Sequence, residues 1–243
     1  MTIPTIGKTT YDGTLPRAAF WDMDGTLINS EPIWHEAELW FAKQYGGHWT
    51  EELGWSVTGT PMSEVARTMI EHGTKLGAEE LAQGIIDYVA ESEMRHMPWI
   101  PGALDVVVAL HEAGVPNVLV TASPRKMAES AVAQAPEGAF FAYVCSDDVE
   151  KKKPDPAPYL AAAAKLGITD PDEIAQCVAL EDSAAGLTSA VTAGATTIAL
   201  TGYNPTDAAE KGEQFATLEN WDGVTPELLG DFVRRRLAGE SAR

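Results

Sequence analysis

The chain has few of the features that would mark a disulfide-rich, membrane-spanning or nucleic-acid-binding protein. Its 243 residues include two cysteines, Cys145 and Cys177, which offer neither a disulfide framework nor the spacing of a metal-binding motif. No apolar run approaches the roughly 20 residues that cross a bilayer. Basic residues are scarce, since 17 lysines and arginines face 36 acidic residues and leave a net charge of −19. This charge argues against nucleic acid and anionic membranes as partners.

Residues 1–14 lack the basic and apolar stretches of a secretory signal peptide, and we therefore expect a cytoplasmic protein. Of the 243 residues 45% are hydrophobic, which is enough for one sizeable core with an inserted segment. Both cysteines lie in apolar segments, where we expect buried thiols.

Short apolar segments alternate with helical segments along most of the chain. The candidate strands cover residues 17–21, 115–121, 140–145, 174–180 and 195–200. Because helical segments separate the later strands, this alternation predicts a parallel sheet with helices on both faces.

A long helical region interrupts the series after the first strand. One helix is predicted to begin near Ser30, and further helices cover residues 60–73 and 77–96. Gly84 lowers the helix propensity of the last of these. The turn residues Pro98–Gly102 then mark the return to alternating helices and strands.

The most informative segment is Phe20–Leu27, in which two carboxylates stand one residue apart at the end of an apolar strand. Side chains at positions i and i+2 point the same way, so Asp22 and Asp24 start on one side until Gly25 lets the backbone turn. Two buried carboxylates about 4 Å apart repel by roughly 4 kcal/mol at an effective dielectric constant of about 20. A cation, a lysine or a shared proton must offset this repulsion. Taken alone, such a pair more often caps the next turn.

Polar residues also follow three later strands. Thr121 ends one strand, the cluster Lys151–Lys153 follows another, and Glu181 and Asp182 follow a third. Each has an ordinary alternative, because threonine can cap a helix, lysines can lie on a solvated turn, and acids can sit in a helix's first turn next to Ser183 as the cap. Their shared position at the C-terminal ends of strands, where open parallel sheets bind ligands, favours a single site.

These segments, in this order, resemble the four motifs of haloacid dehalogenase superfamily phosphatases, in the branch that includes beta-phosphoglucomutase and small sugar phosphatases. D-M-D-G-T-L resembles the first motif, Thr121 the second, Lys153 in K-P-D-P the third, and Glu181–Asp182 in L-E-D-S-x-x-G the fourth. The resemblance spans about residue 17 to about residue 225.

The resemblance implies an α/β fold, with a Rossmann-like parallel sheet covered by helices on both faces and an inserted helical cap domain. Residues 1–29 and 100–243 would form the catalytic core, and residues 30–99 the cap. A cap of this kind would exclude water and select the organic part of the substrate.

The resemblance also assigns roles to the core residues. Asp22 would be the nucleophile that forms an aspartyl-phosphate. Asp24 would protonate the leaving group and then activate water. Thr121 and Lys153 would complete the electrostatic cradle around the phosphoryl group.

Magnesium is the cofactor that the resemblance implies, because hard oxygen ligands suit this ion. Asp22, the main-chain carbonyl of Asp24 and Asp182 would hold it, and Glu181 would support it directly or through water. We further expect Ser123 and Arg125 to contact the substrate. An exposed position in the first turn of a helix is an equal alternative for Arg125.

The predicted function is magnesium-dependent hydrolysis of a small phosphorylated metabolite, which we expect to be a sugar phosphate. The predicted enzyme is a monomer that binds neither nucleic acid nor a membrane. Phosphomutase activity is the main alternative. It is disfavoured because the mutase's supporting histidine and its phosphate-gripping arginine fall at Trp34 and near Met62. Asn29 stands where sugar phosphatases commonly have an acid.

A phospho-aspartate switch module, similar to a response-regulator receiver, is a second alternative from a different class. Receivers also combine an aspartate, a threonine, a lysine and magnesium. The second aspartate of the D-x-D pair and the inserted cap favour an enzyme.

Overall fold

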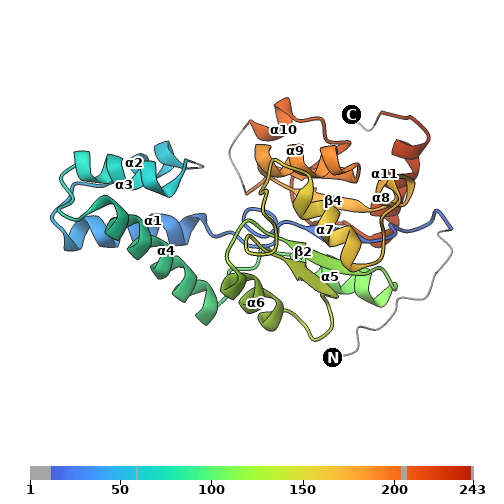
Figure 1. Cartoon of the computed structure of the whole chain (residues 1–243), viewed down its shortest axis with the longest axis horizontal. Helices are drawn as coiled ribbons and strands as arrows, with labels where there is room; N and C mark the ends of the chain where they lie inside the picture. The colour runs from blue at the N-terminus through green and yellow to red at the C-terminus, as the bar shows by residue number, and fades with distance from the viewer. Residues whose placement is uncertain (1–11, 59, 204–206, 242–243) are drawn as a thin grey trace. The chain divides into compact units, whose positions relative to one another are not determined.

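The structure, a computed structural model, describes residues 12–58, 60–203 and 207–241. The chain divides into two compact units, one made of the residues up to Ile28 and from Trp99 onward, the other of Asn29–Pro98 (Figure 1). None of the described helices combines the length and apolar character needed to cross a membrane. That the two units act as catalytic core and cap stays a prediction.

A parallel sheet forms the centre of the first unit. Its strands are β1 (Ala19–Trp21), β2 (Asn117–Val120), β3 (Ala142–Val144), β4 (Val178–Glu181), β5 (Thr196–Leu200) and β6 (Ala216–Leu218). They lie in the order β3-β2-β1-β4-β5-β6, and every neighbouring pair is parallel. This confirms the predicted Rossmann-like sheet. The strand order reverses beside β1, and sheets of this kind bind ligands at the C-terminal ends of the strands near that point.

The strand predicted at residues 174–180 begins later in the structure, because a helix occupies its first residues. This helix, α8, spans Pro171–Ala175 and is capped by Asp170, whose side chain accepts the backbone N–H of Asp172 at 2.8 Å. The edge strand β6 was not predicted, since three residues are too few for a recognisable apolar pattern.

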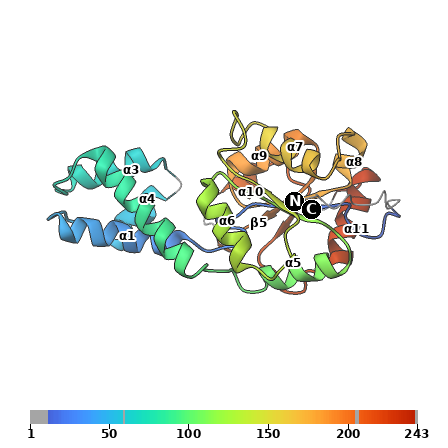
Figure 2. The same cartoon turned by 60° about the horizontal axis from the view of Figure 1, so that its bottom comes forward.

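Helices cover both faces of the sheet (Figures 1 and 2). On one face, α5 (Ala103–Glu112) packs against β2 and α11 (Pro226–Leu237) against β5, and the two helices contact each other. On the other face, α7 (Ala157–Lys165) and α9 (Ala184–Ala193) pack together over the central strands. The unit also contains α6 (Arg125–Gln134) and α10 (Ala208–Lys211).

Two adjacent residues of β1 anchor the opposite faces of the sheet. Phe20 is buried in the apolar cluster that includes Tyr159, beneath α7. Trp21 packs 5.2 Å from the ring of Trp221 and donates its indole N–H to Asn117 Oδ1 at 2.9 Å. Since side chains alternate along a strand, β1 is fixed from both sides, and the residue that follows it is held firmly in place.

The second unit is a helical domain with a core of its own. Its helices are α1 (Glu31–Gln44), α2 (Glu51–Val57), α3 (Met62–Glu71) and α4 (Ala78–Arg95). Helices α3 and α4 confirm the predictions for residues 60–73 and 77–96, whereas α2 was not predicted. Helix α4 continues through Gly84. The position is a glycine because the ring of Phe41 occupies the space that a side chain there would need. The glycine thus permits close helix packing.

This helical unit buries an acidic side chain, Glu38 of α1. Glu38 is 3% exposed, and its carboxylate accepts the indole N–H of Trp49 at 3.0 Å. Burial raises the pKa of Glu38 to about 7; the hydrogen bond from Trp49 opposes the shift, and the charge of Glu31 adds to it. Between its ordinary pKa of 4.5 and about 7, the folded protein binds a proton that the unfolded chain releases. Stability therefore falls as pH rises through this window.

We predict that Glu38→Gln stabilises the protein at pH 8 but not at pH 4. The amide oxygen can still accept the Trp49 N–H, and the cost of burying a charge disappears. The shift in pKa sets an upper size of roughly 3 kcal/mol for the gain in unfolding free energy at pH 8. Urea unfolding of both proteins at the two pH values measures it. If the two proteins differed in unfolding free energy by the same amount at pH 4 and at pH 8, the raised pKa of Glu38 would be contradicted.

Candidate active site

The predicted motif residues converge at the C-terminal edge of the sheet. Asp22 directly follows β1, and Asp182 directly follows β4, the neighbouring strand. Gly25 adopts a positive φ of 80°, which lets the chain turn sharply after Asp24. Lys153 reaches the same place from the loop between β3 and α7.

Lys153 is the centre of a buried ion-pair cluster. Its Nζ lies 2.5 Å from Asp22 Oδ1 and 2.5 Å from Glu181 Oε1, and it donates to the main-chain carbonyl of Val120 at 2.9 Å. An ammonium has three N–H groups, and these three acceptors use all of them. Of the three lysines in the predicted basic cluster, Lys153 is therefore the one built into the site.

Burial and the neighbouring charges shift the pKa of both Asp22 and Lys153. Burial raises the pKa of Asp22 well above its ordinary value, and the charge of Glu181 adds to the rise, whereas Lys153 opposes it. For Lys153 burial favours the neutral amine, but the charges of Asp22 and Glu181 outweigh burial and raise its pKa. The lysine therefore stays charged, and a further cation beside Asp22 would favour its carboxylate form.

Glu181 is fully buried and held by donors on both of its oxygens. Oε1 accepts from Lys153 and, at 2.7 Å, from the hydroxyl of Tyr159. Oε2 lies 3.2 Å from the backbone nitrogen of Asp182, 3.4 Å from that of Ser183 and 3.3 Å from the Ser183 hydroxyl. Because its oxygens are so well occupied, Glu181 is suited to holding its neighbours in place.

A group of three buried carboxylates could hold a metal ion. One oxygen each from Asp22, Glu181 and Asp182 lies within 4.8 Å of the others. Asp182 also accepts from the Thr26 hydroxyl at 3.2 Å, and its carboxylate lies where a side chain at Gly25 would have to be. The glycine thus lets the backbone after Asp24 approach Asp182. Clustered carboxylate oxygens fit a hard divalent cation.

Ser123 connects Asp24 with Thr121, the residue of the second motif. The Ser123 hydroxyl donates to Asp24 Oδ2 at 3.0 Å, and the backbone N–H of Ser123 donates to Thr121 Oγ1 at 2.9 Å. Ser123 therefore links Thr121 to the proposed acid/base. Its predicted contact with the substrate stays a prediction.

Arg125 is held by two side chains of the first unit, Asp148 and Tyr143. Its guanidinium donates to Asp148 Oδ1 at 2.6 Å and to the Tyr143 hydroxyl at 3.2 Å. The charge of Asp148 favours this arrangement, and 43% of the arginine side chain remains exposed. Both alternatives for Arg125 remain open.

Trp34 and Met62, the positions that bear on the mutase alternative, belong to the helical unit. Trp34 lies in α1 and Met62 at the start of α3.

Sequence reasoning missed Tyr159 and Gly186 as parts of the site. Tyr159 reaches Glu181 across 22 residues of sequence, so no local pattern announces the contact. Gly186 stands in the quoted L-E-D-S-x-x-G segment, and the structure supplies its role: a side chain there would overlap the carboxylate of Glu181. Ser183 also caps helix α9, as the ordinary alternative for this segment supposed, because its Oγ accepts the backbone N–H of Gly186 at 3.0 Å.

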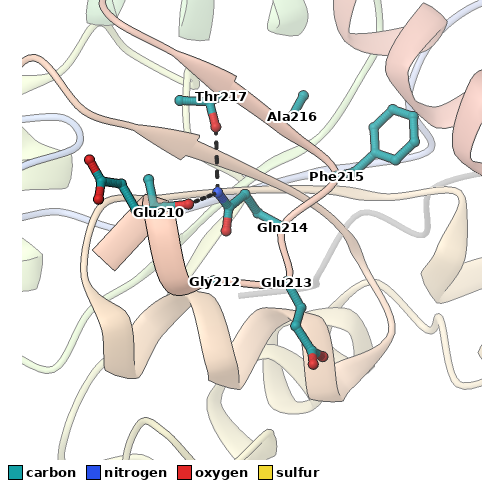
Figure 3. Close-up of a pocket in the computed structure, with 8 residues that line it drawn as sticks. Glu210, Gly212, Glu213, Gln214, Phe215, Ala216 and Thr217 are labelled. Atoms are coloured by element: carbon teal, nitrogen blue, oxygen red, sulfur yellow. Dashed lines mark hydrogen bonds between the residues drawn. The ribbon is translucent and has the colours of Figure 1, made fainter. Parts of the chain in front are cut away.

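A separate open pocket lies beside β6 at the edge of the sheet (Figure 3). It has a volume of about 650 Å³ and is lined by residues 209–210 and 212–217. Gln214 crosses it and donates to the Ala209 carbonyl at 2.6 Å. The lining offers the acids Glu210 and Glu213 and no basic side chain, so it does not suit a phosphate group.

A protein-family model for haloacid dehalogenase-like hydrolases matches residues 16–194, which include all four motif segments. The chain belongs to the haloacid dehalogenase-like hydrolases. The resemblance predicted from the motifs is therefore confirmed, and the ion-pair cluster around Lys153 lies among the residues that the family model covers.

Relatives of this hydrolase include phosphatases. Validoxylamine A 7′-phosphate phosphatase from Streptomyces hygroscopicus subsp. limoneus is 30% identical over 81% of this chain and 91% of its own length. Hexitol phosphatase B from Escherichia coli (strain K12) is 32% identical over 70% of this chain and 77% of its own length.

Solved structures of the same fold include two haloacid dehalogenase-like proteins. Beta-phosphoglucomutase from Clostridium difficile matches with a TM-score of 0.69 at 16% identity, covering 92% of this chain and 100% of that one. A family IA, variant 3 hydrolase from Entamoeba histolytica HM-1:IMSS matches with a TM-score of 0.73 at 23% identity. The match covers 90% of this chain and 99% of that one. At these identities the match establishes the fold alone.

We predict that Gly186→Ala lowers the stability of the protein, although alanine is the better helix former by about 1 kcal/mol. The new methyl group would displace the carboxylate of Glu181, so both thermal stability and Mg²⁺ affinity should fall. Thr188→Ala, on the exposed side of the same helix, is the matched control and should leave both nearly unchanged. Calorimetry of the three proteins measures the two quantities. A gain in stability for Gly186→Ala would show that α9 does not press on Glu181.

Proposed function

We propose that this protein is a magnesium-dependent phosphomonoester hydrolase that acts on a small phosphorylated metabolite of the sugar phosphate class. The observation that carries the proposal is the placement of Asp22: its carboxylate lies 2.5 Å from a buried lysine and within one cluster with Asp182. The groups proposed as nucleophile, charge-stabilising cation and metal ligands thus lie close together, which supports the proposal.

In the proposed reaction, an oxygen of Asp22 attacks the phosphorus in line with the ester bond, which breaks as the new bond forms. Asp24 gives its proton to the departing oxygen. In the second half, Asp24 takes a proton from water, and the water oxygen bonds to the phosphorus. The bond between phosphorus and the Asp22 oxygen breaks, which releases inorganic phosphate and restores the Asp22 carboxylate. The hydrogen bond from Ser123 to Asp24 would help to orient this acid/base.

Lys153 stabilises charge in this scheme. Because its three N–H groups are committed in the resting structure, contact with a phosphoryl oxygen requires it to release one acceptor. Asp22 is the partner that becomes less negative as its oxygen bonds to phosphorus. The lysine can therefore pass from the nucleophile to the transferring group as the charge moves.

We propose that Asp22, Asp182 and the main-chain carbonyl of Asp24 hold Mg²⁺, with Glu181 in support. The fit of the carboxylate cluster, and the gap that Gly25 leaves beside Asp182, support this assignment. When bound, the ion would neutralise charge on the phosphoryl oxygens and align the nucleophile.

The substrate class rests on the relatives, which include a validoxylamine 7′-phosphate phosphatase and a hexitol phosphatase. Both names describe monophosphates of polyhydroxylated carbon skeletons. The alternative, a phosphomutase, is kept because beta-phosphoglucomutase shares the fold. Trp34 and Met62, at the positions expected for polar mutase residues, favour hydrolysis.

We predict that the protein with Mg²⁺ hydrolyses p-nitrophenyl phosphate and hexitol phosphates, and that Asp22→Asn remains folded but inactive. Asp24→Asn should slow hydrolysis of a hexitol phosphate by about 10²- to 10⁴-fold, since that leaving group needs a proton. Chelation should abolish hydrolysis, and added Mg²⁺ should restore it. Phosphate release measures each result.

Asp231→Asn, at a half-buried position of α11 outside the carboxylate cluster, is the matched control and should keep full activity. Beta-glucose 1-phosphate with a trace of glucose 1,6-bisphosphate tests the alternative. Glucose 6-phosphate formation with little phosphate release would favour the mutase. Full hydrolysis by folded Asp22→Asn would refute the covalent mechanism.

A further inference from the structure

Tyr159 is a buried phenol directly beneath the site and has no role in the scheme above. It lies near the start of α7, six positions after Lys153, and its side chain is 1% exposed. Its ring packs 6.3 Å from that of Phe20, within the apolar cluster between α7 and the sheet. Packing on this scale restricts the ring and therefore fixes the position of the hydroxyl.

The hydroxyl of Tyr159 is directed at Glu181. It donates to Oε1 at 2.7 Å, the same oxygen that Lys153 contacts. The Tyr159 ring also lies 5.3 Å from Lys153 Nζ, within the range of a cation–π contact. One side chain thus contacts both members of the Lys153–Glu181 ion pair from the core side.

This contact fixes an oxygen that would otherwise be held by Lys153 alone. Lys153 lies 2.5 Å from both Glu181 and Asp22, so a shift of the Glu181 carboxylate would pull the lysine away from Asp22. The other oxygen of Glu181 accepts from the backbone of Asp182. A single carboxylate therefore connects the lysine to a proposed metal ligand.

We propose that Tyr159 is a positioning residue, which acts through Glu181 to hold Lys153 against Asp22 and to order the backbone at Asp182. The proposal rests on the proposed phosphatase function. Hydrogen-bond partners behind metal-binding and charge-stabilising groups typically contribute about 10- to 100-fold to activity or metal affinity. Tyr159 needs no contact with the substrate to have an effect of this size.

The test is Tyr159→Phe, which removes the hydroxyl and keeps the ring. With p-nitrophenyl phosphate as substrate, kcat should fall about 10- to 100-fold while KM stays the same. Mg²⁺ binding, measured by calorimetry without substrate, should also weaken. The Mg²⁺ measurement does not depend on turnover.

The matched control is Thr196→Val, which also deletes one buried hydroxyl. Thr196 is the first residue of β5, at the N-terminal ends of the strands and so at the end of the sheet away from the site. It is fully buried and donates to the Ala175 carbonyl at 2.9 Å. The Thr196→Val protein should be less stable but should keep the kcat and the Mg²⁺ affinity of the unchanged protein. Equal losses in both variants would reduce Tyr159 to a structural residue and overturn the proposal.

A double-mutant cycle tests whether Tyr159 acts through Glu181. In a Glu181→Gln background, Tyr159→Phe should have little further effect on kcat or on Mg²⁺ affinity. Losses that simply add, or wild-type kcat and Mg²⁺ affinity in Tyr159→Phe, would refute the proposal. Failure of the wild-type protein to hydrolyse any phosphate ester would count against the proposed function, and the Mg²⁺ titrations would still decide the role of Tyr159.

Discussion

The arrangement of this site depends on one ammonium group shared between two buried carboxylates. Lys153 lies between Asp22 and Glu181, and Asp182 adds a third acid to the same cluster. Burying charges is costly unless they are paired and hydrogen-bonded, and removing one partner leaves the others uncompensated. Three carboxylates and one lysine still leave an excess of negative charge. That excess is the physical reason to expect a cation here. If the cluster holds one, stability, metal binding and catalysis depend on the same few charges.

The fold brings these charges together by placing polar residues at the ends of buried strands. Phe20 and Trp21 fix β1 from opposite faces of the sheet, so Asp22 emerges at a defined position. Glycines then make room for the carboxylates, since Gly25 lies against Asp182 and Gly186 against Glu181. The apolar layers thus determine where the charged groups lie, and the charged groups determine what the site can do.

The central fold and the main acids of the site were predictable because their signals are local. An apolar strand followed by Asp22, or by Asp182, can be recognised within ten residues of sequence. The contacts of Tyr159 were not predictable, since they depend on how α7 packs over the sheet. The start of β4 was misplaced because capping of α8 by Asp170 outweighs the apolar character of the following residues. The short edge strand β6 and the helix α2 carry too little periodic pattern to be recognised.

The most direct test of this account is the effect of Mg²⁺ on thermal unfolding at constant ionic strength. If the carboxylate cluster holds the ion, a hundredfold excess of Mg²⁺ over its dissociation constant stabilises the protein by about 2.7 kcal/mol, and the melting temperature should rise by about 5–10 °C. In Asp182→Asn most of this rise should disappear. An unchanged melting temperature in the wild-type protein, or an equal rise in Asp182→Asn, would contradict the claim that this cluster is a metal site.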